Sequence, residues 1–589
     1  MNRPASLLAA LLFAASCKSS NTPTPLTTAH NDGNTASTAP PVVADETPRT
    51  PPVHADPPAA GPARDVHLPT IRRRRLPNGL ELNAVEYHTL PVVHIRLAIR
   101  AGSAHDPANL PGLASLTGDM LKEGTRTKTS AQIAEAIEFV GGSLDVVTGS
   151  DTTTFSISVL KDHAETALAL LAEVLTQSIF PQVELDKLKR REHDRLERSQ
   201  NDPGWLSQRA FAQAVYGPTH PYGRFDTTDA ALTAVTRTAV MNFHRARYTA
   251  GNMMLVVVGD LTPAQLDPIV NRAMGAVRPG ASPATAFPAA PQPAARQVVL
   301  VHRPNSAQSV IRLGNPSLRR RDDDYVPLTV ANHILGGGAS ARLFMDLREL
   351  RSLTYGAYAR LSSSVDVGTW AAAGQVRTPV TGDAMQALFT HVGCITSTPA
   401  PDAELTQTRS YLIDSFALTV ETPGNIADLI AGMRVYGLPD TWYDSYRTRV
   451  QQVDAATAQS MAQRYIRPDR AVVVVVGDAD AQVEVGPPCA AARALPADAT
   501  FQQQIQACAG AQVQTEPAAP RQTVALKELL RAWGPVRVLD TNGTQREELA
   551  ASAALTPPVH ARCEELSAPA LQAISHTEGR PRAAAPPGR

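Results

Sequence analysis

The 589-residue chain lacks an excess of charge of either sign, and it has few charged and few aromatic side chains. Lys and Arg together number 55, as do Asp and Glu, so the formal net charge is zero. Binding to a phosphate backbone usually needs a basic excess, so this balance argues against nucleic acid as a partner. Charged residues make up 19% and proline occurs 48 times, which indicates Pro-rich, weakly charged segments beside ordinary globular ones.

Long hydrophobic runs are also absent. No stretch reaches the roughly 18 uninterrupted apolar residues of a membrane-spanning helix. The first twenty residues, MNRPASLLAALLFAASCKSS, instead place Arg3 before a short apolar run and small residues before Cys17, which is the architecture of a signal peptide.

The segment Ala14-Ala15-Ser16-Cys17 resembles a lipoprotein cleavage site. We therefore expect a signal peptide over residues 1–17 and a lipid anchor on Cys17. Lys18 follows the cysteine, and by resemblance to Gram-negative lipoproteins this implies the outer membrane, with the folded body facing the periplasm. The alternative is a soluble secreted protein that is cleaved nearby.

Residues 18–70 are rich in Thr, Pro, Ala and Ser, and we expect them to form a disordered tether before a folded body that starts near Ile71. Cysteine is scarce. Apart from Cys17 there are four, an even number that agrees with an oxidising compartment. Two pairings stay open, Cys489 with Cys508 or Cys508 with Cys563, and in both we expect Cys394 to be buried and free.

Four short segments recur in the same order at nearly constant displacement. The pairs are Ile95-Arg96-Leu97 with Ile311-Arg312-Leu313, Met120-Leu121 with Ile334-Leu335, Arg247-Tyr248 with Arg464-Tyr465, and Val258-Gly259-Asp260 with Val476-Gly477-Asp478. The body is therefore predicted to be two related domains, residues 71–274 and 297–545, joined by a Pro- and Ala-rich linker over residues 275–296.

Each half mixes strand and helix patterns. Residues 92–100 and 152–159 are β-branched or alternating, whereas residues 131–140 and 164–175 carry apolar side chains at helical spacing. Each half ends with an amphipathic helix and a buried strand, residues 255–258 or 472–476. This predicts an α+β fold of two homologous mixed sheet-plus-helix domains in tandem.

Several motifs resemble the insulinase/pitrilysin (inverzincin) family of zinc metallopeptidases, in particular its small bacterial processing-peptidase-like members. They are Leu76-Pro77-Asn78-Gly79-Leu80, Gly112-Leu113-Ala114, Met120-Leu121, Glu123-Gly124-Thr125, His220-Pro221-Tyr222-Gly223, Gly336-Gly337-Gly338 with Ser340, Arg342-Leu343-Phe344, Leu347-Arg348-Glu349 and Tyr355. The resemblance covers about residues 71–480 and resumes at Trp533-Gly534-Pro535-Val536. Residues 484–528 then read as an insertion and residues 546–589 as a disordered tail.

The resemblance fails at the zinc motif. Active members carry His-x-x-Glu-His on a helix, where the two His bind Zn²⁺ and the Glu acts as general base. Those positions are Ser115, Gly118 and Asp119 here, and the third family ligand falls on Arg195 or Asp194. These residue types cannot reproduce the site.

We also considered whether other side chains could bind a metal in place of the lost motif. The candidates are His193, Asp194, His220 and Asp119, of which we expect no pair at ligand spacing on one helix face. His220, before Pro221, reads as a turn residue. We therefore expect no metal and no cofactor on this chain.

The second half keeps a pair of residues that the family uses for catalysis. Arg348 lies near the end of an expected helix over residues 341–350, and Tyr355 opens an alternating stretch over residues 355–361. The resemblance implies that their guanidinium and phenol groups hydrogen-bond the substrate backbone and the oxyanion. The alternative reading is a solvated helix Arg and an ordinary strand Tyr.

Retention of this pair without a zinc motif resembles the non-catalytic subunit of a paired peptidase. The implied partners are a sister subunit that holds Zn²⁺ and the general base, and a peptide or unfolded polypeptide substrate. The alternative is a structural or peptide-binding lipoprotein with no role in proteolysis. An autonomous zinc peptidase is disfavoured by Ser115, Gly118 and Asp119.

Overall fold

The computed structural model describes residues 66–485, 522–552 and 563–567, all within the compact unit Pro62–Arg589. The first half contains strands β1 (Arg72–Arg75), β2 (Glu81–Glu86), β3 (Val92–Ile99), β4 (Ser143–Thr148), β5 (Thr153–Leu160) and β6 (Met253–Gly259). Its helices are α1 (Leu113–Met120), α2 (Ser130–Glu138), α3 (Ala164–Gln177), α4 (Gln182–Ser199), α5 (Pro203–Tyr216), α6 (Asp229–Ala234), α7 (Arg237–Arg247) and α8 (Pro263–Met274).

The second half repeats this mixture. Its strands are β7 (Gln297–His302), β8 (Gln308–Pro316), β9 (Thr354–Leu361), β10 (Thr369–Arg377), β11 (Val472–Gly477), β14 (Val536–Leu539) and β15 (Gln545–Leu549). Its helices are α9 (Tyr325–Gly336), α10 (Arg342–Phe344), the π-helix η4 (Met345–Leu350), α11 (Thr381–Ser397), α12 (Asp402–Thr419), α13 (Pro423–Tyr436), α14 (Trp442–Gln451), α15 (Ala455–Tyr465) and α18 (Leu526–Leu530). Strands β12 (Gln482–Val485) and β13 (Gln522–Ala525) form a small separate sheet.

The two large sheets share one strand order, which confirms the predicted α+β fold of two similar halves. The first runs β1-β2-β6-β3-β5-β4 and the second β15-β14-β7-β11-β8-β10-β9. The order β2-β6-β3-β5-β4 in the first sheet corresponds to β7-β11-β8-β10-β9 in the second, and in each case the first two strands are parallel and the others antiparallel. The second sheet adds a further parallel pair, β14 with β7. The repeated segments occupy matching places, because Ile95 pairs with Val257 and Ile311 with Val475.

The central strands β6 and β11 are buried along their whole length. Their Val-rich sequences suit strands that are covered on both faces. One face of the first sheet packs against helices of its own half, including Leu116 of α1 and Leu171 of α3.

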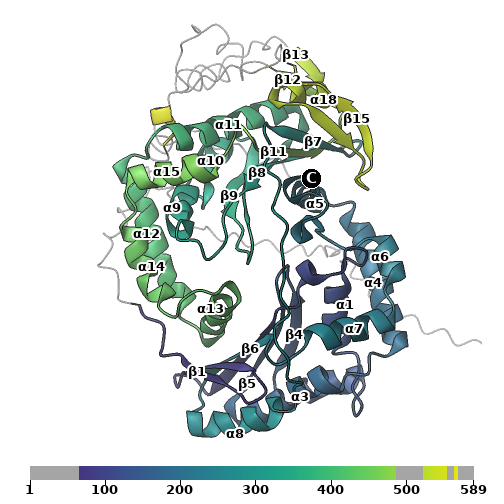
Figure 1. Ribbon diagram of the computed structural model, residues 1–589. Helices are drawn as coiled ribbons and strands as arrows, with labels where there is room; N and C mark the ends of the chain where they lie inside the picture. Colours follow the sequence, from purple (N-terminus) through teal and green to yellow (C-terminus); the bar gives the residue numbers. More distant parts are fainter. Residues whose placement is uncertain (1–65, 486–521, 553–562, 568–589) are drawn as a thin grey trace, which may run out of the picture. The chain divides into compact units, whose positions relative to one another are not determined.

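The opposite faces are covered by a reciprocal exchange of helices (Figure 1). Helix α5, from the first half, packs against β8 and β11 of the second sheet, and α13, from the second half, packs against β3 and β6 of the first. The buried contacts include Phe211 of α5 in a cluster with Val474, and Ile430 of α13 in a cluster with Val256. Each half therefore completes the core of the other.

A sequence repeat marks the two exchanged helices. Both begin with Pro-Gly, at residues 203 and 423, and both end with Tyr followed by Gly, at residues 217 and 437. Proline suits the first turn of a helix, where its missing N–H has no partner, and glycine suits the residue after the end. Both closing glycines have positive φ, 72° for Gly217 and 68° for Gly437.

A buried hydrogen-bond network also links the halves. The Tyr222 hydroxyl donates to Asp151 Oδ1 at 2.5 Å and accepts from the Asp366 backbone N–H at 3.2 Å. His220 Nε2 lies 3.3 Å from Asp366 Oδ2, and the His220 side chain is fully buried. His220 caps the short helix that follows it, but it is an interior residue and not the exposed turn histidine that its place before Pro221 suggests.

The structure corrects the cysteine predictions. Cys394 of α11 forms a disulfide with Cys563, so Cys394 is not free and Cys563 is not paired with Cys508. The sequence separation of 169 residues gives no local signal for this pairing. Cys489 and Cys508 lie outside the described residues.

Ordered elements also reach into the segments read as insertion and tail. Strands β12 and β13 pair from Gln482↔Ala525 to Val485↔Gln522, which places structure at both ends of the 484–528 insertion. Strand β15 runs to Leu549, and Cys563–Leu566 forms a short helix, so residues 546–589 are not a disordered tail throughout.

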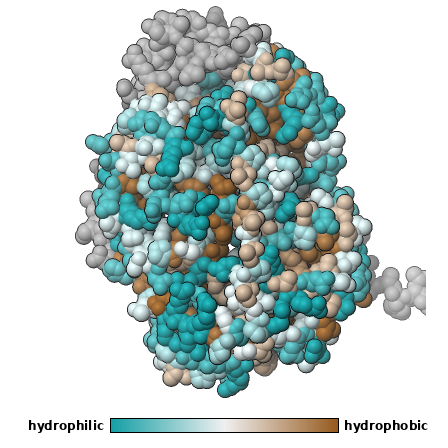
Figure 2. Space-filling model, viewed as in Figure 1, coloured by the Kyte–Doolittle hydropathy of each residue, from teal (hydrophilic) through white to brown (hydrophobic). Residues whose placement is uncertain are grey.

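The described helices include none long and apolar enough to cross a bilayer. On the face drawn in Figure 2, hydrophobic residues show in patches among hydrophilic ones. The expected signal peptide and the tether lie almost wholly outside the described residues, and so does Cys17.

Candidate functional site

Helix α1 carries all three positions of the degenerate zinc motif, Ser115, Gly118 and Asp119. Its start is fixed by the buried Asp106, whose carboxylate accepts from the backbone N–H groups of Gly112 and Ala114, both at 2.7 Å. Burial raises the pKa of Asp106 to about 7.

Gly118 lies against the sheet with almost no free space beside it. A Cβ there would come within 3.1 Å of Thr148 Oγ1 and of Thr153 Cγ2, and 3.3 Å from Val146 Cγ1. A side chain at this position would require these three neighbouring side chains to shift by a few tenths of an ångström.

Asp119 is the single potential zinc ligand left among the three positions. Burial raises its pKa to about 6; the nearby charge of Glu192 adds to this effect, while Lys122 opposes it. Arg195, at one of the two positions expected for the third ligand, binds Asp226 through two hydrogen bonds of 3.0 and 2.8 Å. Asp194, at the other expected position, is an exposed carboxylate. The α1 positions still do not fit zinc, because Ser115 and Gly118 supply neither an imidazole ligand nor the carboxylate of a general base.

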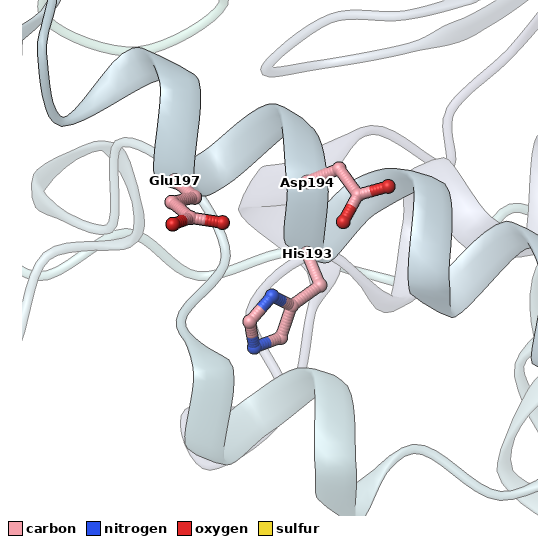
Figure 3. Close-up of side chains that lie close together, drawn as sticks. All are labelled: His193, Asp194 and Glu197. Carbon is pink, nitrogen blue, oxygen red and sulfur yellow. The ribbon is translucent and has the colours of Figure 1, made fainter.

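A different group of donors lies further along α4 (Figure 3). His193, Asp194 and Glu197 have potential ligand atoms within 4.8 Å of one another, and all three residues are exposed. His193 and Glu197 stand four positions apart on one face of α4, and Glu197 was not among the donors considered in the sequence analysis. His193 Nε2 also lies 3.3 Å from Asp229 Oδ1.

A second such group is His302, Asp478 and Asp480 at the ends of β7 and β11. It has internal partners. His302 Nδ1 accepts from the Ala479 N–H at 3.0 Å, and Asp480 forms an ion pair with Lys527 at 3.0 Å. Neither cluster includes Asp119 or His220.

The Arg and Tyr of the second half lie on neighbouring elements. Arg348 belongs to the π-helix η4, and its guanidinium carbon lies 4.7 Å from the centre of the Phe344 ring. The expected helix over residues 341–350 is thus α10 followed by a π-helix, a wider turn that often marks functional positions. Tyr355 lies on β9, the last strand of its sheet, and its side chain points into solvent with 89% exposure.

Sequence reasoning missed the groups behind Arg348. The buried Asp346 accepts hydrogen bonds from His391 Nε2 and from Arg351 Nε, both at 2.8 Å. Burial opposes ionisation of Asp346, but the positive charge of Arg351 and the His391 hydrogen bond outweigh it and hold its pKa below the ordinary value. The one sequence signal for Asp346 is its position between the motifs Arg342-Leu343-Phe344 and Leu347-Arg348-Glu349.

Comparison with known proteins assigns the family. The family model "Insulinase (Peptidase family M16)" matches residues 84–218, and "Peptidase M16 inactive domain" matches residues 234–412. This chain belongs to the insulinase (peptidase M16) family. The second match covers the half that carries Arg348 and Tyr355.

Relatives and solved structures agree with this assignment. An uncharacterized zinc protease of Streptomyces coelicolor is 26% identical over 428 residues, which are 70% of this chain and 91% of that protein. The uncharacterized zinc protease YmxG of Bacillus subtilis is 27% identical over 51% of this chain and 72% of its own length. The crystal structure of a peptidase M16 inactive domain from Pseudomonas fluorescens has a TM-score of 0.66 and 26% identity, and the match covers 69% of this chain and 98% of that one.

Proposed function

We propose that this M16-family protein is a non-catalytic subunit of a heteromeric zinc metallopeptidase. It contributes Arg348 and Tyr355 to a zinc-bearing sister subunit that degrades or processes peptides outside the cytoplasm. The chain itself binds no zinc. A lipid on Cys17 holds it in the cell envelope, at the outer membrane with the folded body facing the periplasm.

The observation that carries this proposal is the exposure of the Arg348 and Tyr355 side chains. Tyr355 is 89% exposed and the Arg348 side chain 46% exposed. Both side chains are therefore accessible to a partner or a peptide. The α1 positions, by contrast, have a filled space at Gly118 and a lone carboxylate at Asp119.

The chemistry of the pair suits a partner's active site. The planar guanidinium of Arg348 can donate two hydrogen bonds to backbone carbonyls of a bound peptide. The Tyr355 hydroxyl can donate to the oxygen that gains negative charge at the scissile carbonyl. Both groups act as hydrogen-bond donors, and the general base belongs to the partner.

The edge strands support peptide binding. Among the described strands, β1 and β4 stand at the ends of the first large sheet and β15 and β9 at the ends of the second, so one edge of each pairs with no other strand of its sheet. An extended peptide can add to such an edge through main-chain hydrogen bonds. Tyr355 lies on one of these strands, β9.

The disulfide supports a location outside the cytoplasm. Cys394 and Cys563 are bonded, and structural disulfides persist mainly in oxidising compartments.

The test is to mix this chain with an M16 protein that carries an intact His-x-x-Glu-His motif and to measure cleavage of an unfolded polypeptide. Arg348→Ala or Tyr355→Phe should lower turnover about 100- to 1,000-fold, as loss of a transition-state donor does, with complex formation unchanged. Arg348→Lys should restore activity only in part, because a point charge cannot replace the planar fork.

Matched controls separate these effects from general damage. Arg377→Ala and Tyr411→Phe change the same residue types at other exposed positions of the second half and should be silent. If the partner is equally active alone, or if Arg348→Ala and Tyr355→Phe are silent too, the protein is instead a structural or peptide-binding lipoprotein.

A further inference from the structure

The segment that presents Arg348 has an uncommon backbone. In η4 the Arg351 N–H donates to the Asp346 carbonyl, five residues back, at 2.9 Å. The helix is closed by Ser352, a non-glycine residue with a φ of +52°. Such conformations cost free energy and persist where surrounding contacts fix them.

One set of contacts holds η4 from within the domain. Asp346 is fully buried, and it accepts from Arg351 within its own segment and from His391 of α11. The other ring nitrogen, His391 Nδ1, has no hydrogen-bond partner in the described part of the chain. Asp346 therefore ties both ends of the π-helix region to one residue of α11.

A second set of contacts comes from far along the chain. Cys394 lies three residues after His391 on α11, on the same helix face, and it is bonded to Cys563. The disulfide brings Leu566 into a small buried cluster with Met345, and the partly buried Leu350 packs against the same cluster. We call residues 563–566 the tethered segment.

We propose that Asp346 and the tethered segment are positioning groups for Arg348: they hold η4 in the conformation that presents the guanidinium, and cleavage of the Cys394–Cys563 disulfide loosens it. The role given to Arg348 rests on the proposed function. The contacts that hold η4 do not depend on it. A dithiol reductant supplies two electrons and two protons, so that the S–S bond breaks, two thiols form and the reductant becomes a disulfide.

The first experiment uses the full chain alone. Amide hydrogen exchange of residues 345–353 is measured by mass spectrometry before and after treatment with dithiothreitol. We expect exchange at least about tenfold faster after reduction, with strands β6 and β11 unchanged. Unchanged exchange at residues 345–353 would overturn the inference whatever the protein's function.

Variants assign the effect to this disulfide. Cys563→Ser should show the faster exchange without reductant, and dithiothreitol should then add nothing. Leu566→Gln keeps the disulfide, removes the apolar contact with Met345 and should give the same change. Asp346→Asn should loosen the same residues, whereas Asp106→Asn, which alters a buried carboxylate at the start of α1, should not.

The second experiment uses the mixture with a zinc-bearing partner. Cys563→Ser should lower turnover about 10- to 100-fold, as misplacement of a catalytic group does. In an Arg348→Ala background the same change should have a much smaller effect, because the guanidinium that η4 presents is gone. Equal losses in both backgrounds would overturn the positioning role. If Arg348→Ala is itself silent while exchange at residues 345–353 still accelerates, the proposed function fails and the clamp on η4 stands.

Discussion

Replacing Phe211 with alanine should destabilise the second half of the protein, although Phe211 belongs to the first half in sequence. Phe211 lies on α5 in the first half, is 6% exposed and packs in a cluster with strands of the second sheet. Its ring fits over Gly314 of β8, where a Cβ would lie 2.8 Å from the Phe211 Cζ atom. The Arg312 guanidinium carbon lies 5.8 Å from the ring centre.

The expected cost follows from this burial. Removing a buried phenylalanine ring loses its transfer free energy and leaves a cavity, so the free energy of unfolding should fall by about 3–5 kcal/mol. Phe139→Ala is the matched control, because Phe139 is 90% exposed and its loss should change stability by less than about 0.5 kcal/mol.

Two assays check the prediction. Urea denaturation followed by circular dichroism gives the free energy of unfolding of each variant. Hydrogen exchange then locates the loss, and strands β8 and β11 should lose protection in Phe211→Ala. A loss below about 1 kcal/mol, or full protection of β8 and β11 beside a frayed α5, would refute the exchange of helices as a source of stability.

Three further predictions concern other sites. Tyr222→Phe removes a donor from the partly buried Asp151 and should lower the free energy of unfolding by about 1–3 kcal/mol in urea denaturation, unlike Tyr411→Phe at an exposed position. Burial lowers the pKa of His244 to about 4, below its ordinary value of 6.5, so the folded state binds fewer protons than the unfolded state. The free energy of unfolding should therefore fall as the pH drops from 6.5 to 4. His244→Gln should reduce that fall when denaturation curves at about pH 7 and about pH 5 are compared. If Cys17 is acylated, Cys17→Ala should move the protein from the membrane to the soluble fraction on cell fractionation or block its maturation.

Elemental analysis of the purified chain gives a last check, and it should find well under one zinc per chain. One tightly bound zinc, removed by a chelator together with peptidase activity, would contradict the proposed function. Ser115→His, Gly118→Glu and Asp119→His together should not create a site, because neighbouring side chains crowd position 118 and neither expected third-ligand position, Arg195 or Asp194, carries the family's Glu.

The repeated segments were enough to predict two similar α+β domains, because hydrophobic periodicity and duplication are local properties of a sequence. Ile95 and Ile311 indeed occupy matching register positions in the two sheets. The resemblance to the family placed the three motif positions on one helix, and they lie on α1.

Features made by tertiary contacts were not predictable in this way. The π-helix at Arg348 depends on Asp346 meeting His391, a residue 45 positions away. The disulfide joins residues 169 positions apart. The pair His193 and Glu197 was within reach, since a spacing of four can be read directly from the sequence.

The exchange of α5 and α13 also determines when the hydrophobic core of the first half can be completed during synthesis. When β6 has just been made, the face of the first sheet that α13 will cover is still open to water, and residues 260–422 must be synthesised before α13 begins. At about 5–20 residues per second this takes roughly 10 to 30 seconds, a long time for an apolar sheet face to stay uncovered. The nascent protein should therefore depend on a chaperone that shields Val256 and its neighbours until the second half arrives.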